Sequence, residues 1–65
     1  MDKKLAILNE MLEVQGRDGT WNWDTYMHGL FNGMEYAVAT LEGREPKFRV
    51  APEKWLSDKL KEESE

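Results

Sequence analysis

Residues 23–42 read WDTYMHGLFNGMEYAVATLE, and this stretch decides the fold. At about 100° per residue its apolar side chains fall within an arc of roughly 140°, which predicts a helix with one core-facing stripe. Gly43 follows directly and is a typical helix stop. The stripe consists of Tyr26, Met27, Leu30, Phe31, Met34, Ala37, Val38 and Leu41.

The start of this helix has two candidate caps. Asn22 as the cap would let Trp21 and Tyr26 form a hydrophobic staple across the first turn. Asp24 as the cap would begin the helix two residues later, with its carboxylate facing the positive end of the helix. The sequence is compatible with both caps.

A second helical pattern occupies residues 2–15, with Asp2 as a possible N-cap and Gly16 as the stop. The polar residues 17–20 then predict a turn, so the two long helices form a hairpin. The apolar positions that define this first helix are Leu5, Ile7, Leu8, Met11, Leu12 and Val14.

The C-terminal third begins with a break at residues 43–46. The alternating run 47–50 is too short for an independent sheet and predicts an extended connector with Phe48 and Val50 turned inward. Pro52 suits the first turn of a third helix over residues 52–62, whose Trp55 would close the core. The acidic end, residues 62–65, is expected to fray. The fold class is therefore all-α: a single domain over residues 1–65, a helical hairpin plus a short third helix.

Composition narrows the classes of function. The 65 residues include no cysteine and one histidine, and they carry a net charge of −4. A chain of this length buries only about 60% of its unfolded surface, so self-association is a plausible source of stability. Negative charge disfavours nucleic acid and anionic membrane as partners, because contacts to phosphate need cationic groups. No segment resembles a membrane span or a signal peptide, which favours a reducing cytoplasm.

Gly29 and Gly33 lie inside the predicted second helix, where each costs about 1 kcal/mol relative to alanine. Small residues at this spacing allow another backbone to approach closely. Two interpretations stay open: close packing within the chain, or a homodimer through paired second helices. The candidate helix-contact residues are Gly29, Leu30, Gly33, Met34, Ala37 and Thr40.

Aromatic and polar side chains supply candidates for partner binding. Two tryptophans separated by one residue can seldom both point inward, so one of Trp21 and Trp23 should be exposed. His28, Asn32 and Glu35 share one side of the second helix, which we interpret as a solvated face. Nothing resembles a triad or a metal ligand set, so we expect no enzyme activity and no cofactor. The candidate partner-binding residues are Trp21, Trp23, Tyr26, His28, Asn32, Glu35 and Tyr36.

The run from residue 21 to residue 48 resembles a group of short proteins encoded by tailed bacteriophages, and residues 51–56 resemble their usual ending. Together these segments cover somewhat over half of the chain, and the most distinctive part is YMHGLFNGM at residues 26–34. The resemblance implies a phage origin and action in the cytoplasm of an infected bacterium. The resemblance does not imply any particular biochemical activity.

The sequence thus predicts a small accessory protein, homodimeric, that binds a host protein and modulates or inhibits it, in host takeover or against host defence. The alternative is a structural or scaffolding component of the phage, or an oligomer that sequesters a small signalling molecule.

Overall fold

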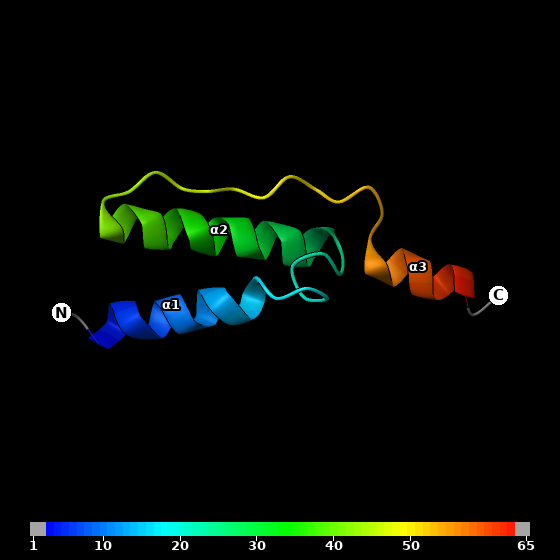
Figure 1. Cartoon of the computed structure of the whole chain (residues 1–65), viewed down its shortest axis with the longest axis horizontal. Helices are drawn as coiled ribbons and strands as arrows, with labels where there is room; N and C mark the ends of the chain where they lie inside the picture. Colours follow the sequence, from blue (N-terminus) through cyan, green and yellow to red (C-terminus); the bar gives the residue numbers. More distant parts are fainter. Residues whose placement is uncertain (1–2, 64–65) are drawn as a thin grey trace.

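The structure is a computed structural model that describes residues 3–63. Within these residues the chain forms three helices and no strand. α1 spans Lys3–Gln15, α2 spans Thr25–Glu42 and α3 spans Leu56–Glu63. α1 and α2 lie side by side and antiparallel, and the chain then returns along α2 to α3 (Figure 1). The predicted all-α class, a hairpin with a short third helix, is confirmed. The expected cap Asp2 lies outside the described residues.

Both ends of α2 follow from local chemistry. The Asp24 carboxylate accepts a hydrogen bond from the Met27 N–H at 2.9 Å, so Asp24 is the cap and the helix begins at Thr25. Asn22 instead closes the preceding turn, because its side-chain oxygen accepts from the Gly19 N–H at 2.7 Å. At the other end Gly43 adopts the left-handed conformation, with φ of 71°, and ends the helix.

The core is small and lies under one side of α2. Its buried apolar side chains within residues 3–63 are Phe31, Val38 and Ala39. The predicted stripe is only half buried, because Tyr26, Leu30, Ala37 and Leu41 are exposed. The reason is that α2 is covered from two directions, by α1 and by the returning chain, and the buried sector is rotated toward both.

The returning chain packs differently from the expected connector. We call residues 44–50 the strap. Its Phe48 and Val50 were expected inside, but they are 53% and 87% exposed. Arg49 contacts the core instead, although the residue as a whole is exposed: its guanidinium carbon lies 4.3 Å from the centre of the Phe31 ring. Polar contacts of the strap backbone with α2 override the apolar pattern here.

The third helix begins at Leu56 rather than at Pro52. Its first N–H groups bond to the loop before α2: Leu56 N to Asn22 O at 3.1 Å and Ser57 N to Trp23 O at 3.0 Å. α3 then projects beyond the hairpin instead of covering the core, in a molecule of 50 × 20 × 14 Å (Figure 1). The helix continues to Glu63, past the predicted start of the frayed tail, and the last two residues lie outside the described range.

Candidate functional site

The polar side of α2 binds the strap and is not a solvated face. Asn32 contacts both backbone groups of Arg49: its oxygen accepts from the N–H at 2.9 Å, and its nitrogen donates to the carbonyl at 3.0 Å. His28 Nε2 lies 2.7 Å from the same carbonyl oxygen. The prediction of a solvated face was wrong because these side chains satisfy the backbone of an extended segment, which helical periodicity does not reveal.

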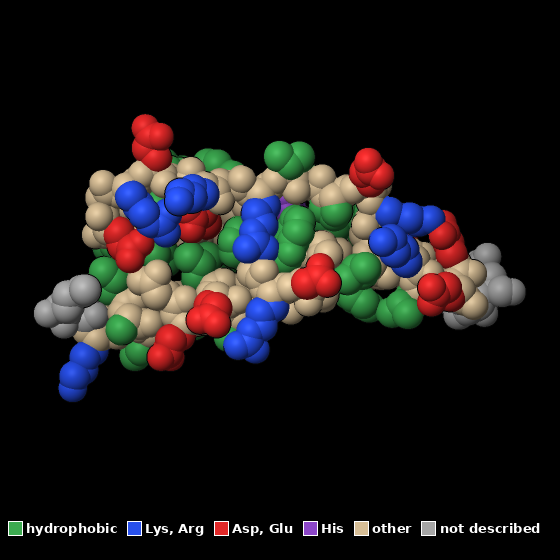
Figure 2. All heavy atoms as spheres, viewed as in Figure 1, with side chains coloured by type: hydrophobic (Ala, Val, Ile, Leu, Met, Phe, Trp, Pro, Cys, Tyr) green, Lys and Arg blue, Asp and Glu red, His purple; other side chains and the backbone are tan. Residues whose placement is uncertain are grey.

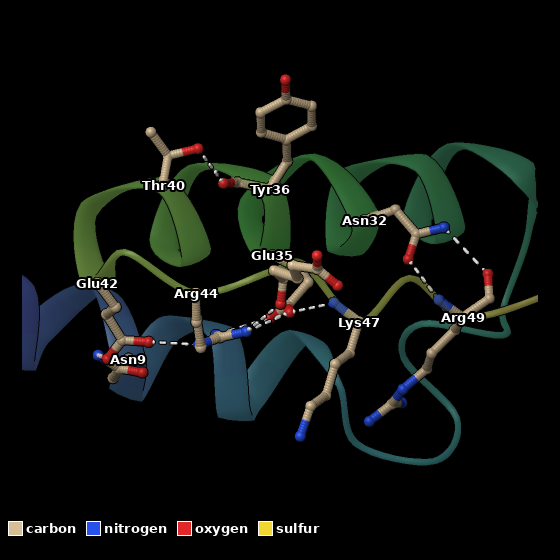
Figure 3. Close-up of polar contacts among 10 residues, drawn as sticks. Asn9, Asn32, Glu35, Tyr36, Thr40, Glu42, Arg44, Lys47 and Arg49 are labelled. Carbon is tan, nitrogen blue, oxygen red and sulfur yellow. Dashed lines mark hydrogen bonds and ion pairs between the residues drawn. The ribbon is translucent and has the colours of Figure 1, made fainter.

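Glu35 is the buried polar residue of this side, at 4% exposure. Its carboxylate accepts two hydrogen bonds from the Arg44 guanidinium, at 2.6 and 3.1 Å, and a third from the Lys47 N–H at 2.6 Å (Figure 3). The hydrogen bonds from Arg44, with the one from Lys47, outweigh burial and lower the pKa of Glu35 from 4.5 to about 2. Glu35 is therefore ionised and fastens the start of the strap.

Arg44 extends this network to α1. Its Nε donates to Glu42 at 2.7 Å, and Glu42 also accepts from the Asn9 side chain at 3.1 Å. Hydrogen bonds from Arg44 and then Asn9 lower the pKa of Glu42, and the two carboxylates raise the pKa of Arg44. The strap, α2 and α1 are thus joined by one chain of polar contacts, which reaches α1 through the neutral side chain of Asn9.

Arg49 fastens the other end of the strap. Its guanidinium donates to the Gly16 carbonyl oxygen at 2.6 Å and lies 5.0 Å from the centre of the Trp21 ring. His28 lies between Trp21 and Trp55, with ring centres 6.1 and 5.5 Å apart. Cation–π contact and ring packing therefore close the end of the hairpin where helical packing alone is sparse.

An open depression of about 530 Å³, which we call the strap depression, lies where the strap meets α2. Arg44 is compensated by its two carboxylates, but within residues 3–63 the Lys47 ammonium has no hydrogen-bond or ion-pair partner. Figure 2 shows basic and acidic side chains interspersed along this face of the molecule. The residues that line the strap depression are Phe31, Glu35, Arg44, Lys47, Phe48 and Arg49.

A second surface runs along the opposite side of α2. We call Tyr26, Leu30, Gly33, Ala37 and Leu41 the α2 outer face; all five are exposed and none is charged. A Cβ placed on Gly33 would meet no packed neighbour within 4 Å. The interpretation that this glycine packs closely within the chain is therefore wrong.

The remaining predicted contact residues border this face. Gly29 is equally open, and Thr40 is exposed with its hydroxyl bonded to the carbonyl of Tyr36 at 2.9 Å. Met34 is half-buried. The glycine with a close neighbour is instead Gly16, and that neighbour is a side chain: a Cβ there would lie 2.7 Å from Phe31 Cε1.

The aromatic candidates for partner binding differ in exposure. Trp23 is exposed and Trp21 is half-buried, which confirms that one of the pair faces outward. Tyr26 and Tyr36 are both well exposed, and the Tyr36 ring lies 6.0 Å from that of Phe48.

The residues that the sequence analysis missed are Arg44, Lys47 and Arg49. A signal was available, since these cations fall within six positions of an acidic chain, and two of them are the polar members of the alternating run 47–50. The alternating pattern of residues 47–50 predicted which side chains lie on the same side of the segment. It did not predict which of the two sides faces α2.

The described part of the chain contains neither a metal-ligand set nor a membrane-spanning helix. No group of three His, Asp or Glu side chains within residues 3–63 could hold a metal ion, and no helix there has the length and hydropathy of a membrane span. Comparisons with protein-family models, curated proteins and solved structures find no match.

Proposed function

We propose that the protein acts by binding another protein and not by catalysing a reaction. The α2 outer face is the observation that carries this proposal, because contiguous exposed apolar surface marks sites of protein contact. α1 adds a second exposed apolar row, formed by Ile7, Met11 and Val14. A core with few buried side chains also favours stabilisation by a partner.

The first partner is a second copy of the chain. In a two-fold dimer the same patch meets itself, and an uncharged patch avoids like charges between two chains that each carry −4. In an antiparallel pairing centred near Gly33, Leu30 would face Ala37 and Tyr26 would face Leu41. The large Leu30 would then oppose the small Ala37, and the glycine would let the helices cross closely.

The second partner is a host protein. The resemblance to short phage proteins supports a role inside an infected bacterium, where the protein modulates or inhibits a host factor. Affinity capture from infected cells tests this part: a stoichiometric host protein supports it, and recovery of virion proteins alone favours a structural role in the phage.

Sedimentation of Ala37→Glu tests the dimer. This change puts a charge in the middle of the α2 outer face, and we expect the mass of one chain with unchanged helix content. Ala6→Glu on the exposed surface of α1 is the matched control and should keep the mass of two chains. A wild type that sediments as one chain at every concentration would disprove the dimer.

A further inference from the structure

The strap has one backbone edge bonded to α2 and one edge without a partner. The N–H groups of Lys47 and Arg49 and the carbonyl of Arg49 are bonded to α2 side chains. In an extended chain successive residues turn their backbone groups to opposite sides. Those of Phe48 and Val50 therefore point away from α2, and no group within residues 3–63 bonds to them. An edge of this kind can pair with another chain.

The side chains along this edge form two rows of different chemistry. Lys47 and Arg49 extend to the same side of the strap, toward α1 (Figure 3). Phe48 and Val50 form the alternate row and are largely exposed, with Phe48 against the ring of Tyr36. A partner strand would therefore meet cations at one set of alternate positions and apolar groups at the other.

We propose that the open edge of residues 47–50 docks an extended acidic segment of a partner protein, which pairs with the strap as an added β-strand. Its main-chain groups bond to those of Phe48 and Val50. Its carboxylates lie beside Lys47 and Arg49, and its apolar residues lie beside Phe48 and Val50. This inference rests on the proposed function, action through protein contact, and adds the chemistry of the partner.

Charge selects an acidic segment over a second strap. Two copies paired through this edge would bring Lys47 and Arg49 close to the same cations, and like charges on paired strands are destabilising. The Glu35 carboxylate accepts its hydrogen bonds from Arg44 and the Lys47 N–H, and within residues 3–63 neither the Lys47 ammonium nor the Arg49 guanidinium bonds to it. The strap depression leaves room for acidic side chains beside Lys47 and Arg49.

The test uses a capped peptide of alternating Glu and Val, about seven residues long, with calorimetry as the readout. One control peptide replaces Glu by Lys, and another is N-methylated at alternate residues to block main-chain pairing. In the protein, Val50→Pro removes an outward N–H that has no partner within residues 3–63, and Val50→Ala is the matched control that keeps it. Circular dichroism checks that each variant keeps its helices.

We expect the Glu peptide to bind the wild type and the Lys peptide to bind at least about tenfold more weakly at low salt. Val50→Pro should weaken binding by about fivefold to tenfold, the loss of one main-chain hydrogen bond, and Val50→Ala should weaken it less. Equal binding of the Glu and Lys peptides, full binding by Val50→Pro, or no binding by the wild type would each overturn the proposal. Self-association that Val50→Pro abolishes without peptide would assign the edge to a second copy and overturn it as well.

Ala37→Glu separates this proposal from the dimer. The variant alters the α2 outer face and leaves the strap intact, so it should bind the Glu peptide as the wild type does. Loss of peptide binding in this variant would overturn the assignment of the peptide site to the strap edge alone.

Discussion

Asn32 holds both backbone groups of Arg49, its side-chain oxygen at 2.9 Å from the N–H and its nitrogen at 3.0 Å from the carbonyl oxygen. One side chain of α2 therefore sets the register of the strap. Because an extended chain alternates with a period of two, the same contact turns the backbone groups of Phe48 and Val50 away from α2.

Asn32→Ala should release the C-terminal end of the strap, at Arg49, while the helices persist. Two hydrogen bonds are lost, each worth about 1 kcal/mol, so hydrogen exchange at the Arg49 N–H should accelerate by at least about tenfold. Thr40→Ala is the control, because its hydroxyl bonds only within α2. Unchanged exchange at Arg49 would show that other contacts hold the strap.

Glu35→Gln should lower the free energy of unfolding by about 1 to 3 kcal/mol, because the amide places a donor against the Arg44 guanidinium. The midpoint of thermal unfolding measures this loss. Glu45→Gln, at an exposed position one residue beyond Arg44, should change the midpoint little. Equal midpoints for the two variants would argue against a stabilising role for the Glu35–Arg44 pair.

The pH dependence of stability should show the same contact. The pKa of Glu35 is lowered from 4.5 to about 2 by Arg44, so its contribution is fully present above about pH 4.5 and is lost as the pH falls toward 2. The wild type should therefore be more stable than Glu35→Gln at pH 6, and the difference should shrink between pH 4.5 and 2. Urea unfolding at several pH values measures the difference, and a constant difference across this range would contradict the assignment.

The glycines should respond in opposite directions to alanine. Gly16→Ala would press a methyl group against the buried Phe31 ring and should destabilise the fold by about 1 to 3 kcal/mol. Gly29→Ala and Gly33→Ala add a methyl group without a packed neighbour inside a helix and should each stabilise it, by up to about 1 kcal/mol. Thermal unfolding at concentrations too low for association provides the test. A stabilising Gly16→Ala would show that Phe31 moves aside easily.

The proposed dimer adds a condition to this comparison. At concentrations where two chains associate, Gly33→Ala should weaken association if the α2 outer faces cross closely. Sedimentation of Gly33→Ala and Gly33→Leu, each compared with the wild type, measures that effect separately from helix stability.

Local sequence determined the three helices, the hairpin and the C-terminal stop of α2. These features depend on residues within a few positions of one another: apolar spacing near 3.6, a polar cap and a glycine that can adopt positive φ. The choice of Asp24 over Asn22 required the structure, because both residues can cap a helix and only the preceding turn occupies Asn22.

Tertiary structure alone decided which side of α2 is buried and what its polar side does. The apolar arc of α2 was wide enough for either half of it to face the core. The strap covers the side of α2 that carries Glu35 and Ala39, and Leu30 and Leu41 are therefore left exposed to solvent. Alternation in residues 47–50 likewise showed two rows of side chains but not their orientation. Contacts distant in sequence, from Asn32 to Arg49 and from Arg49 to Gly16, set that orientation. No pattern in a single segment contains them, because each depends on two segments that meet only in the folded chain.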